Sequence, residues 1–159
     1  MERLEPHNCV YLDEAGIDNT EDYSYGWCKR GERFAAERRG SRRERVSFIA
    51  ALCQKTMLAP MTDEGYCNRN VFETWLEQAL LPTLEPGKVI ICDNATFNKG
   101  GRIQSLVAQA GGRLLYLPPY SPDLNPIEHW WFVLKNRMRK KILASDPFRT
   151  VVDQAFADA

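Results

Sequence analysis

Two aspartates that follow short apolar runs are the first candidates for chemistry in this sequence. Asp13 ends the run Asn8–Asp13, and Asp93 ends the run Lys88–Asp93. Both runs are typical of β-strands, and sites in open α/β sheets gather at the carboxyl ends of strands. If the two strands are parallel neighbours, the aspartates lie roughly 5 Å apart, and divalent cations relieve the repulsion between them. Oxygen-only ligation favours Mg²⁺ or Mn²⁺. The alternative is that each aspartate is a turn or cap residue, which is common at strand ends.

Glu128 is a third candidate, and the sequence supports two interpretations of it. It lies three residues after Asn125, in the first turn of the last predicted helix. Asn125 can cap that helix, and Glu128 can complete a capping box by accepting a hydrogen bond from the Asn125 N–H. Alternatively, Glu128 shares one flank of the helix with Lys135 and Arg139, so it could hold a metal ion while the two cations bind phosphates. The helical pattern alone leaves both interpretations open.

The elements that must position these side chains form a mixed sheet flanked by helices. Strands are predicted over 8–13, 23–31, 46–54, 88–93 and 113–118. Helices are predicted over 71–82 and 103–110 and from Asn125 onward, with 55–70 as a looser connection. Consecutive strands early in the chain indicate an antiparallel meander, and the later alternation with helices indicates parallel pairing. We expect residues 1–159 to form a single domain.

Charge is segregated along the chain although the formal net charge is zero. Residues 1–22 contain seven acidic residues and one basic residue. Residues 29–45 contain eight basic and three acidic residues, and 135–141 contain five basic and none acidic. Such segregation can place a cationic surface beside an anionic cluster. The alternative is that these charges only solvate loop and helix faces.

Composition excludes several other classes of protein. Hydrophobic residues make up 44% and charged residues 26%, as in an ordinary globular domain. No apolar stretch approaches the ~20 residues that cross a bilayer, so we expect a soluble protein of the cytoplasm. The five cysteines include no CxxC pair, which argues against a zinc site and favours buried thiols.

Three segments together resemble the catalytic core of mariner-type transposases, including their bacterial insertion-sequence relatives. They are YLDEAG (11–16), ICDNATFNKG (91–100) and YLPPYSPDLNPIEHWWFVLK (116–135). The 34 residues between Asp93 and Glu128 match the separation in one branch of that superfamily. The resemblance spans nearly the whole chain. It implies a ribonuclease-H-like fold, shared with retroviral integrases, and a triad of Asp13, Asp93 and Glu128 that binds two Mg²⁺ ions, for which Mn²⁺ can substitute.

The resemblance also implies an activity and its partners. The activity is hydrolysis at transposon ends followed by attack of the freed 3′-hydroxyls on target DNA, with two metal ions assisting each in-line displacement. The partners are DNA and a second copy of the chain, bound at the bacterial nucleoid. Basic residues of both clusters are candidate phosphate contacts. They are Lys29, Arg30, Arg33, Arg38, Arg39, Arg42, Arg43, Lys135 and Arg139.

The chain departs from the family pattern in two places. Asn98 stands where relatives commonly have a histidine. The amino-terminal helix-turn-helix region of the family is expected to be missing, either because it is separately encoded or because this chain is a fragment. Two other functions therefore stay open: a host nuclease or resolvase on the same fold, and a decayed or domesticated remnant that binds DNA or a partner without cutting.

Overall fold

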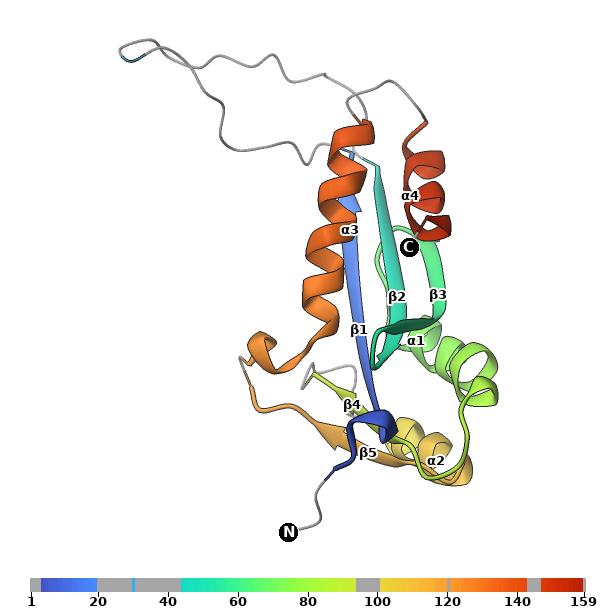
Figure 1. Cartoon of the computed structure of the whole chain (residues 1–159). Coiled ribbons are helices and arrows are strands. Elements are labelled where there is room, and N and C mark those ends of the chain that lie inside the picture. Colours follow the sequence, from blue (N-terminus) through green and yellow to red (C-terminus); the bar gives the residue numbers. More distant parts are fainter. Residues whose placement is uncertain are drawn as a thin grey trace.

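A mixed five-stranded sheet forms the centre of the computed structural model, which describes residues 4–19, 30, 44–93, 101–119, 121–142 and 147–158 (Figure 1). The strand order is β3-β2-β1-β4-β5, and β4 pairs in parallel with both β1 and β5. β1, β2 and β3 form an antiparallel meander. This arrangement confirms the predicted mixed sheet. The strand bounds are Cys9–Asp18 (β1), Arg45–Cys53 (β2), Thr56–Glu64 (β3), Val89–Cys92 (β4) and Arg113–Tyr116 (β5).

Helices cover both faces of this sheet. One face packs against α3 and α4, and the other packs against α1, the turns that follow it, and α2. The helix bounds are Arg69–Trp75 (α1), Gly101–Gln109 (α2), Ile127–Ile142 (α3) and Phe148–Ala157 (α4). A π-helical turn, Leu76–Leu80, continues α1, and short 3₁₀ turns span Pro6–Asn8, Leu81–Thr83 and Pro122–Leu124.

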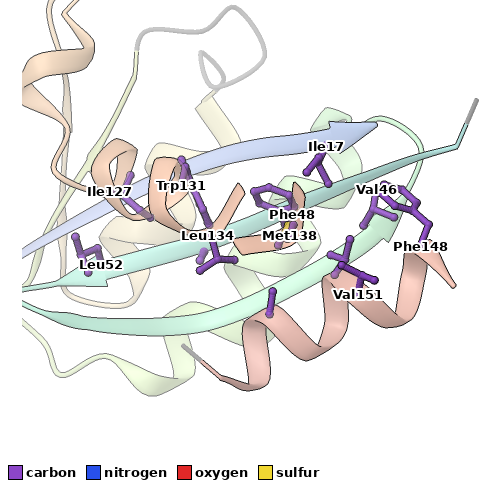
Figure 2. Packing of buried hydrophobic residues seen from close by; sticks show 13 residues of the cluster. Ile17, Val46, Phe48, Leu52, Ile127, Trp131, Leu134, Met138, Phe148 and Val151 are labelled. Carbon is purple, nitrogen blue, oxygen red and sulfur yellow. The ribbon is translucent and has the colours of Figure 1, made fainter. Parts of the chain in front are cut away.

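Alternation along β1 divides the core into two clusters. Ile17 lies in the cluster on the α3 and α4 face, whereas Val10 and Leu12 lie in the cluster on the opposite face. This follows from the two-residue period of a strand, which points successive side chains to opposite faces. Figure 2 shows the first cluster, in which Trp131 of α3 lies beside Phe48 of β2. Asp13 is an odd-numbered position of β1, so it points to the α3 face.

β1 is longer than predicted, and this changes the setting of Asp13. The sequence indicated a strand that ends at Asp13 in a turn, which was wrong. β2 continues to pair with β1 beyond that point, from Asp13 opposite Ala50 to Asp18 opposite Arg45. The hydrogen bonds to β2 therefore carry the strand through Gly16, and Asp13 lies within a strand rather than at its end.

The segment predicted as a looser connection contains β3, an edge strand. Its pairing with β2 shifts between Ile49 and Ala51, and Ala59 there has a φ of 45°. Pro60 follows at this bulge, where a missing backbone N–H costs no ladder hydrogen bond. The irregular edge explains why the apolar alternation was hard to see. The strand predicted over 23–31 falls outside the described residues, apart from Arg30.

Two further expectations concern the membrane and the cysteines. Among the described segments, no helix is long and apolar enough to cross a membrane. Cys9 and Cys92 are buried free thiols, and Cys53 and Cys67 are partly buried free thiols. Cys28 lies outside the described residues. The expectation of buried thiols is confirmed for Cys9 and Cys92, whereas Cys53 and Cys67 are only partly buried.

Candidate active site

The parallel pairing of β1 and β4 places Asp13 and Asp93 level with each other. The register joins Cys9 to Val89, Val10 to Ile90 and Tyr11 to Ile91. Two further steps along the same register reach Asp13 on β1 and Asp93, which directly follows the last residue of β4. The strands are the parallel neighbours that the prediction required. Asp93 stands at the carboxyl end of its strand, as predicted. Asp13 lies at the same level but inside its strand, since β1 continues beyond the point where β4 ends.

Asp13 is a buried carboxyl group in an acidic environment. Its side chain is on the α3 face, and the residue is only 8% exposed. The Trp131 indole N–H donates to Asp13 Oδ2 over 2.9 Å. Burial, followed by the charges of Glu128 and Glu14, raises the pKa of Asp13 from 3.8 to about 8, although the Trp131 hydrogen bond opposes this rise. The site therefore favours a proton or a cation at Asp13.

Glu14 is a further acidic residue beside this group. Its Oε2 atom is buried and has no hydrogen-bond partner among the described residues. Burial, followed by the charge of Asp93, raises the pKa of Glu14 from 4.5 to about 7. Because Glu14 follows Asp13 along the strand, its side chain starts from the opposite face of the sheet. Its adjacency to Asp13 was visible in the sequence, but no role was predicted for it.

Glu128 comes to the site from the first turn of α3. Its charge raises the pKa values of both Asp13 and Glu14, so it lies within electrostatic reach of both. The capping interpretation is wrong in both parts. The Asn125 N–H donates to the Pro122 carbonyl over 2.8 Å, so it is not held by the Glu128 carboxylate. Asn125 Oδ1 is buried and accepts no hydrogen bond from the described residues, which include the first turn of α3, so it does not cap the helix.

The chemistry of these donors fits a hard divalent cation. All are carboxylates, which suit Mg²⁺ or Mn²⁺ better than zinc or copper. The buried Glu14 oxygen without a partner and the raised pKa of Asp13 both indicate uncompensated negative charge. Within the described part of the chain, however, no three His, Cys, Asp or Glu side chains converge closely enough to hold a metal ion. The structure thus brings the carboxylates into one region without closing them into a coordination shell among the described residues.

Only part of the predicted DNA-binding set falls within the described residues. Lys135 and Arg139 are half-buried on α3, where Arg139 also donates to Asn136 Oδ1 over 3.1 Å. Arg30 is exposed. Contact between these residues and DNA stays a prediction. The rest of the set lies outside the described residues, namely Lys29, Arg33, Arg38, Arg39, Arg42 and Arg43, as does Asn98.

Comparison with solved structures defines the class of fold. The chain is similar to the Mos1 mariner transposase in its paired end complex with Mn, with a TM-score of 0.67 and 16% identity over 96% of this chain and 52% of the other. It is also similar to the Mos1 transposase catalytic domain solved with Raltegravir and Mg, with a TM-score of 0.63 and 17% identity over 98% of this chain and 73% of the other. The fold is therefore the ribonuclease-H-like fold of transposase and integrase catalytic cores, as predicted.

The sequence comparisons then identify the family. The chain belongs to the DDE superfamily endonucleases, whose family model matches residues 8–148. Among curated relatives, it is 36% identical to the Transposable element Tc1 transposase of Caenorhabditis elegans over 69 residues. That match covers 43% of this chain and 25% of the relative, so the chain matches only about a quarter of that protein's length.

Proposed function

We propose that this chain is the catalytic part of a metal-dependent DNA transposase. It cleaves phosphodiesters at transposon ends and joins the resulting 3′-hydroxyls to target DNA by in-line phosphoryl transfer. The observation that carries this proposal is the shared level of Asp13 and Asp93 on neighbouring parallel strands, with Glu128 of α3 in electrostatic reach. Membership of an endonuclease superfamily supports the same chemistry at the family level.

Asp13, Asp93 and Glu128 would hold the metal ions. When bound there, Mg²⁺ or Mn²⁺ would supply charge neutralisation at the phosphate and a lower pKa for the attacking water or 3′-hydroxyl. The carboxylates bind and orient, and none of them needs to form a covalent intermediate. The named cations in the two Mos1 structures, Mn and Mg, support this choice of metal.

DNA is the proposed partner of the surface next to these carboxylates. α3 carries Glu128 in its first turn and Lys135, Arg139 and further basic residues toward its end. A helix with this order of charges can hold a phosphate chain along its length while its first turn faces the scissile bond. The Mos1 transposase paired-end complex with left transposon end supports DNA binding, and a second copy of the chain on the DNA is part of the proposal. The same proposal includes a separately encoded amino-terminal half that recognises DNA. It also places the DNA-bound protein at the nucleoid, in the cytoplasm.

A strand-transfer assay tests the proposal. The substrate is DNA with the terminal repeats that flank the gene, already cut to expose a 3′-hydroxyl, at low salt and high protein concentration. The wild type is compared with Asp93→Asn and with Asp123→Asn, an exposed aspartate of the 3₁₀ turn before α3. We expect joining that requires Mg²⁺ or Mn²⁺ and is lost only in Asp93→Asn. DNA binding without cutting or joining under any metal would instead support a remnant.

A further inference from the structure

The indole of Trp131 donates a hydrogen bond to Asp13, one of the proposed metal ligands. We propose that Trp131 is a positioning residue that orients the Asp13 carboxylate for metal binding. Its N–H holds Asp13 Oδ2 and leaves Oδ1 as the oxygen presented to a cation. This inference rests on the proposed function, because it assigns Trp131 a role at the metal site inferred above.

The geometry of the contact is that of a buried, well-formed hydrogen bond. Trp131 Nε1 lies 2.9 Å from Asp13 Oδ2, and both residues are buried, at 2% and 8% exposure. An indole N–H is only a donor, so it cannot exchange roles with the carboxylate. It also carries no charge, so it does not compete with a cation as an arginine or lysine in its place would. One oxygen of Asp13 is thereby fixed, and the orientation of the carboxylate plane follows.

The indole is itself held by aromatic side chains from two other elements. Its ring centroid lies 5.1 Å from that of Phe48 on β2 and 6.4 Å from that of Phe156 on α4. Phe48 and Phe156 also contact each other, with centroids 5.4 Å apart. Figure 2 shows Phe48 and Trp131 side by side within the cluster between α3 and the sheet. The donor is therefore rigid, and a rigid donor orients its acceptor better than a mobile one.

The position of Trp131 on α3 links two candidate ligands. It lies three residues after Glu128, which is almost one helical turn. The same helix therefore supplies Glu128 and sets the orientation of Asp13 on β1. Residues that orient metal ligands in this way typically change metal affinity by about 10- to 100-fold when the hydrogen bond is removed.

Trp75 offers a matched control on the other face of the sheet. It is also 2% exposed, and its indole N–H donates to the Ala59 carbonyl over 2.7 Å. It packs against Phe72, with centroids 5.7 Å apart, in the cluster that does not include Trp131. Replacing either tryptophan with phenylalanine removes one buried indole hydrogen bond and similar ring volume. Only the Trp131 change affects a candidate metal ligand.

The experiment measures Mn²⁺ binding by the whole 159-residue chain, from the electron paramagnetic resonance signal of free Mn²⁺. We expect Trp131→Phe to bind Mn²⁺ about 10- to 100-fold more weakly than the wild type, and Trp75→Phe to bind within about threefold of it. Circular dichroism establishes that each variant is folded at the temperature used. If Trp131→Phe does not fold, β-(3-benzothienyl)alanine at position 131 keeps the ring size and removes only the N–H.

A second measurement reports on the contact itself. In ¹H–¹⁵N spectra, Mg²⁺ should shift the indole resonance that disappears in Trp131→Phe, and should leave the Trp75 indole resonance in place. Equal Mn²⁺ affinity in the Trp131 and Trp75 variants, with a wild type that binds, would overturn the positioning role and leave the proposed function standing. A wild type that binds no Mn²⁺ would overturn both.

Discussion

Replacing Asp13 with asparagine removes a buried ionisable carboxyl group and keeps both the shape of the side chain and an oxygen that accepts the Trp131 indole N–H. We expect the metal-free Asp13→Asn variant to be more stable than the wild type near neutral pH, although it should lose the metal site. The reason is that the wild-type fold holds Asp13 where burial and the charges of Glu128 and Glu14 disfavour ionisation. Asparagine has no ionised form to disfavour.

The magnitude follows from the raised pKa of Asp13, from 3.8 to about 8. A carboxyl whose pKa is raised on folding contributes its full stability below the unfolded pKa and loses it as pH rises through the folded pKa. At pH 7 the folded state keeps a proton that the unfolded chain has released. The difference of 3.2 pH units, 7 minus 3.8, corresponds to about 4 kcal/mol of lost stability, at 1.36 kcal/mol per unit. For a domain of this size that shifts the melting temperature by roughly 10 °C.

The assay is thermal unfolding in EDTA from pH 4 to pH 8.5, followed by circular dichroism. The melting temperature of the wild type should fall relative to that of Asp13→Asn as pH rises, and the two should converge near pH 4. The exposed Asp123→Asn variant serves as the matched control and should follow the wild type. Mg²⁺ or Mn²⁺ should reverse the order, since the cation replaces the proton at Asp13 and stabilises the wild type more at higher pH. Parallel pH profiles of wild type and Asp13→Asn in EDTA would refute the reasoning.

The remaining predictions address the other candidate ligands and the basic surface. Millimolar Mg²⁺ or Mn²⁺ should raise the melting temperature of the wild type and have a smaller effect on Asp93→Asn; identical melting curves with and without metal would argue against a metal site. Glu128→Gln should lower strand cleavage by several orders of magnitude and shift the melting temperature by only a few degrees, and wild-type cleavage by this variant would exclude Glu128 as a ligand. DNA binding should be weak, tolerant of sequence and steeply salt-dependent, and the salt dependence should be less steep in the double variant Lys135→Gln/Arg139→Gln. Tight, salt-insensitive binding to one duplex would contradict this view.

The sequence predicted the parts of the fold that local pattern controls. β4 and α2 have bounds close to those expected, because each is a compact apolar run or a helical stripe that ends at a clear signal. Asp93 was placed correctly for the same reason. α4 was not predicted although its pattern was available. Its buried residues, Phe148, Val151, Val152 and Ala155, recur at helical spacing.

Features that depend on pairing between distant segments were not predictable in this way. β1 passes Asp13 because β2 supplies hydrogen bonds as far as Asp18, and nothing in the local sequence around Gly16 indicates this. β3 combines a bulge with Pro60, which local patterns treat as a break. The Glu128 half of the capping box is absent because the Asn125 N–H donates to the Pro122 carbonyl, a contact set by the turn before the helix. The acidic surroundings of Glu14 and the Trp131 contact depend on how β1 packs against α3 and pairs with β4.

The position of α3 connects these findings to the choice between the two interpretations of Glu128. A capping role would tie the Glu128 carboxylate to the Asn125 N–H, but that N–H is donated to Pro122. The Asn125 N–H at the start of α3 is thus satisfied by the preceding turn and not by Glu128. Meanwhile α3 is fixed against β1 by Trp131, whose hydrogen bond to Asp13 sets how close the first turn of the helix lies to the acidic group. Because core residues hold α3 in place, the Glu128 carboxylate can stay close to Asp13 and Glu14 despite the repulsion between them. A divalent cation bound between these groups would remove that repulsion. That combination is expected of a ligand and is not explained by a cap.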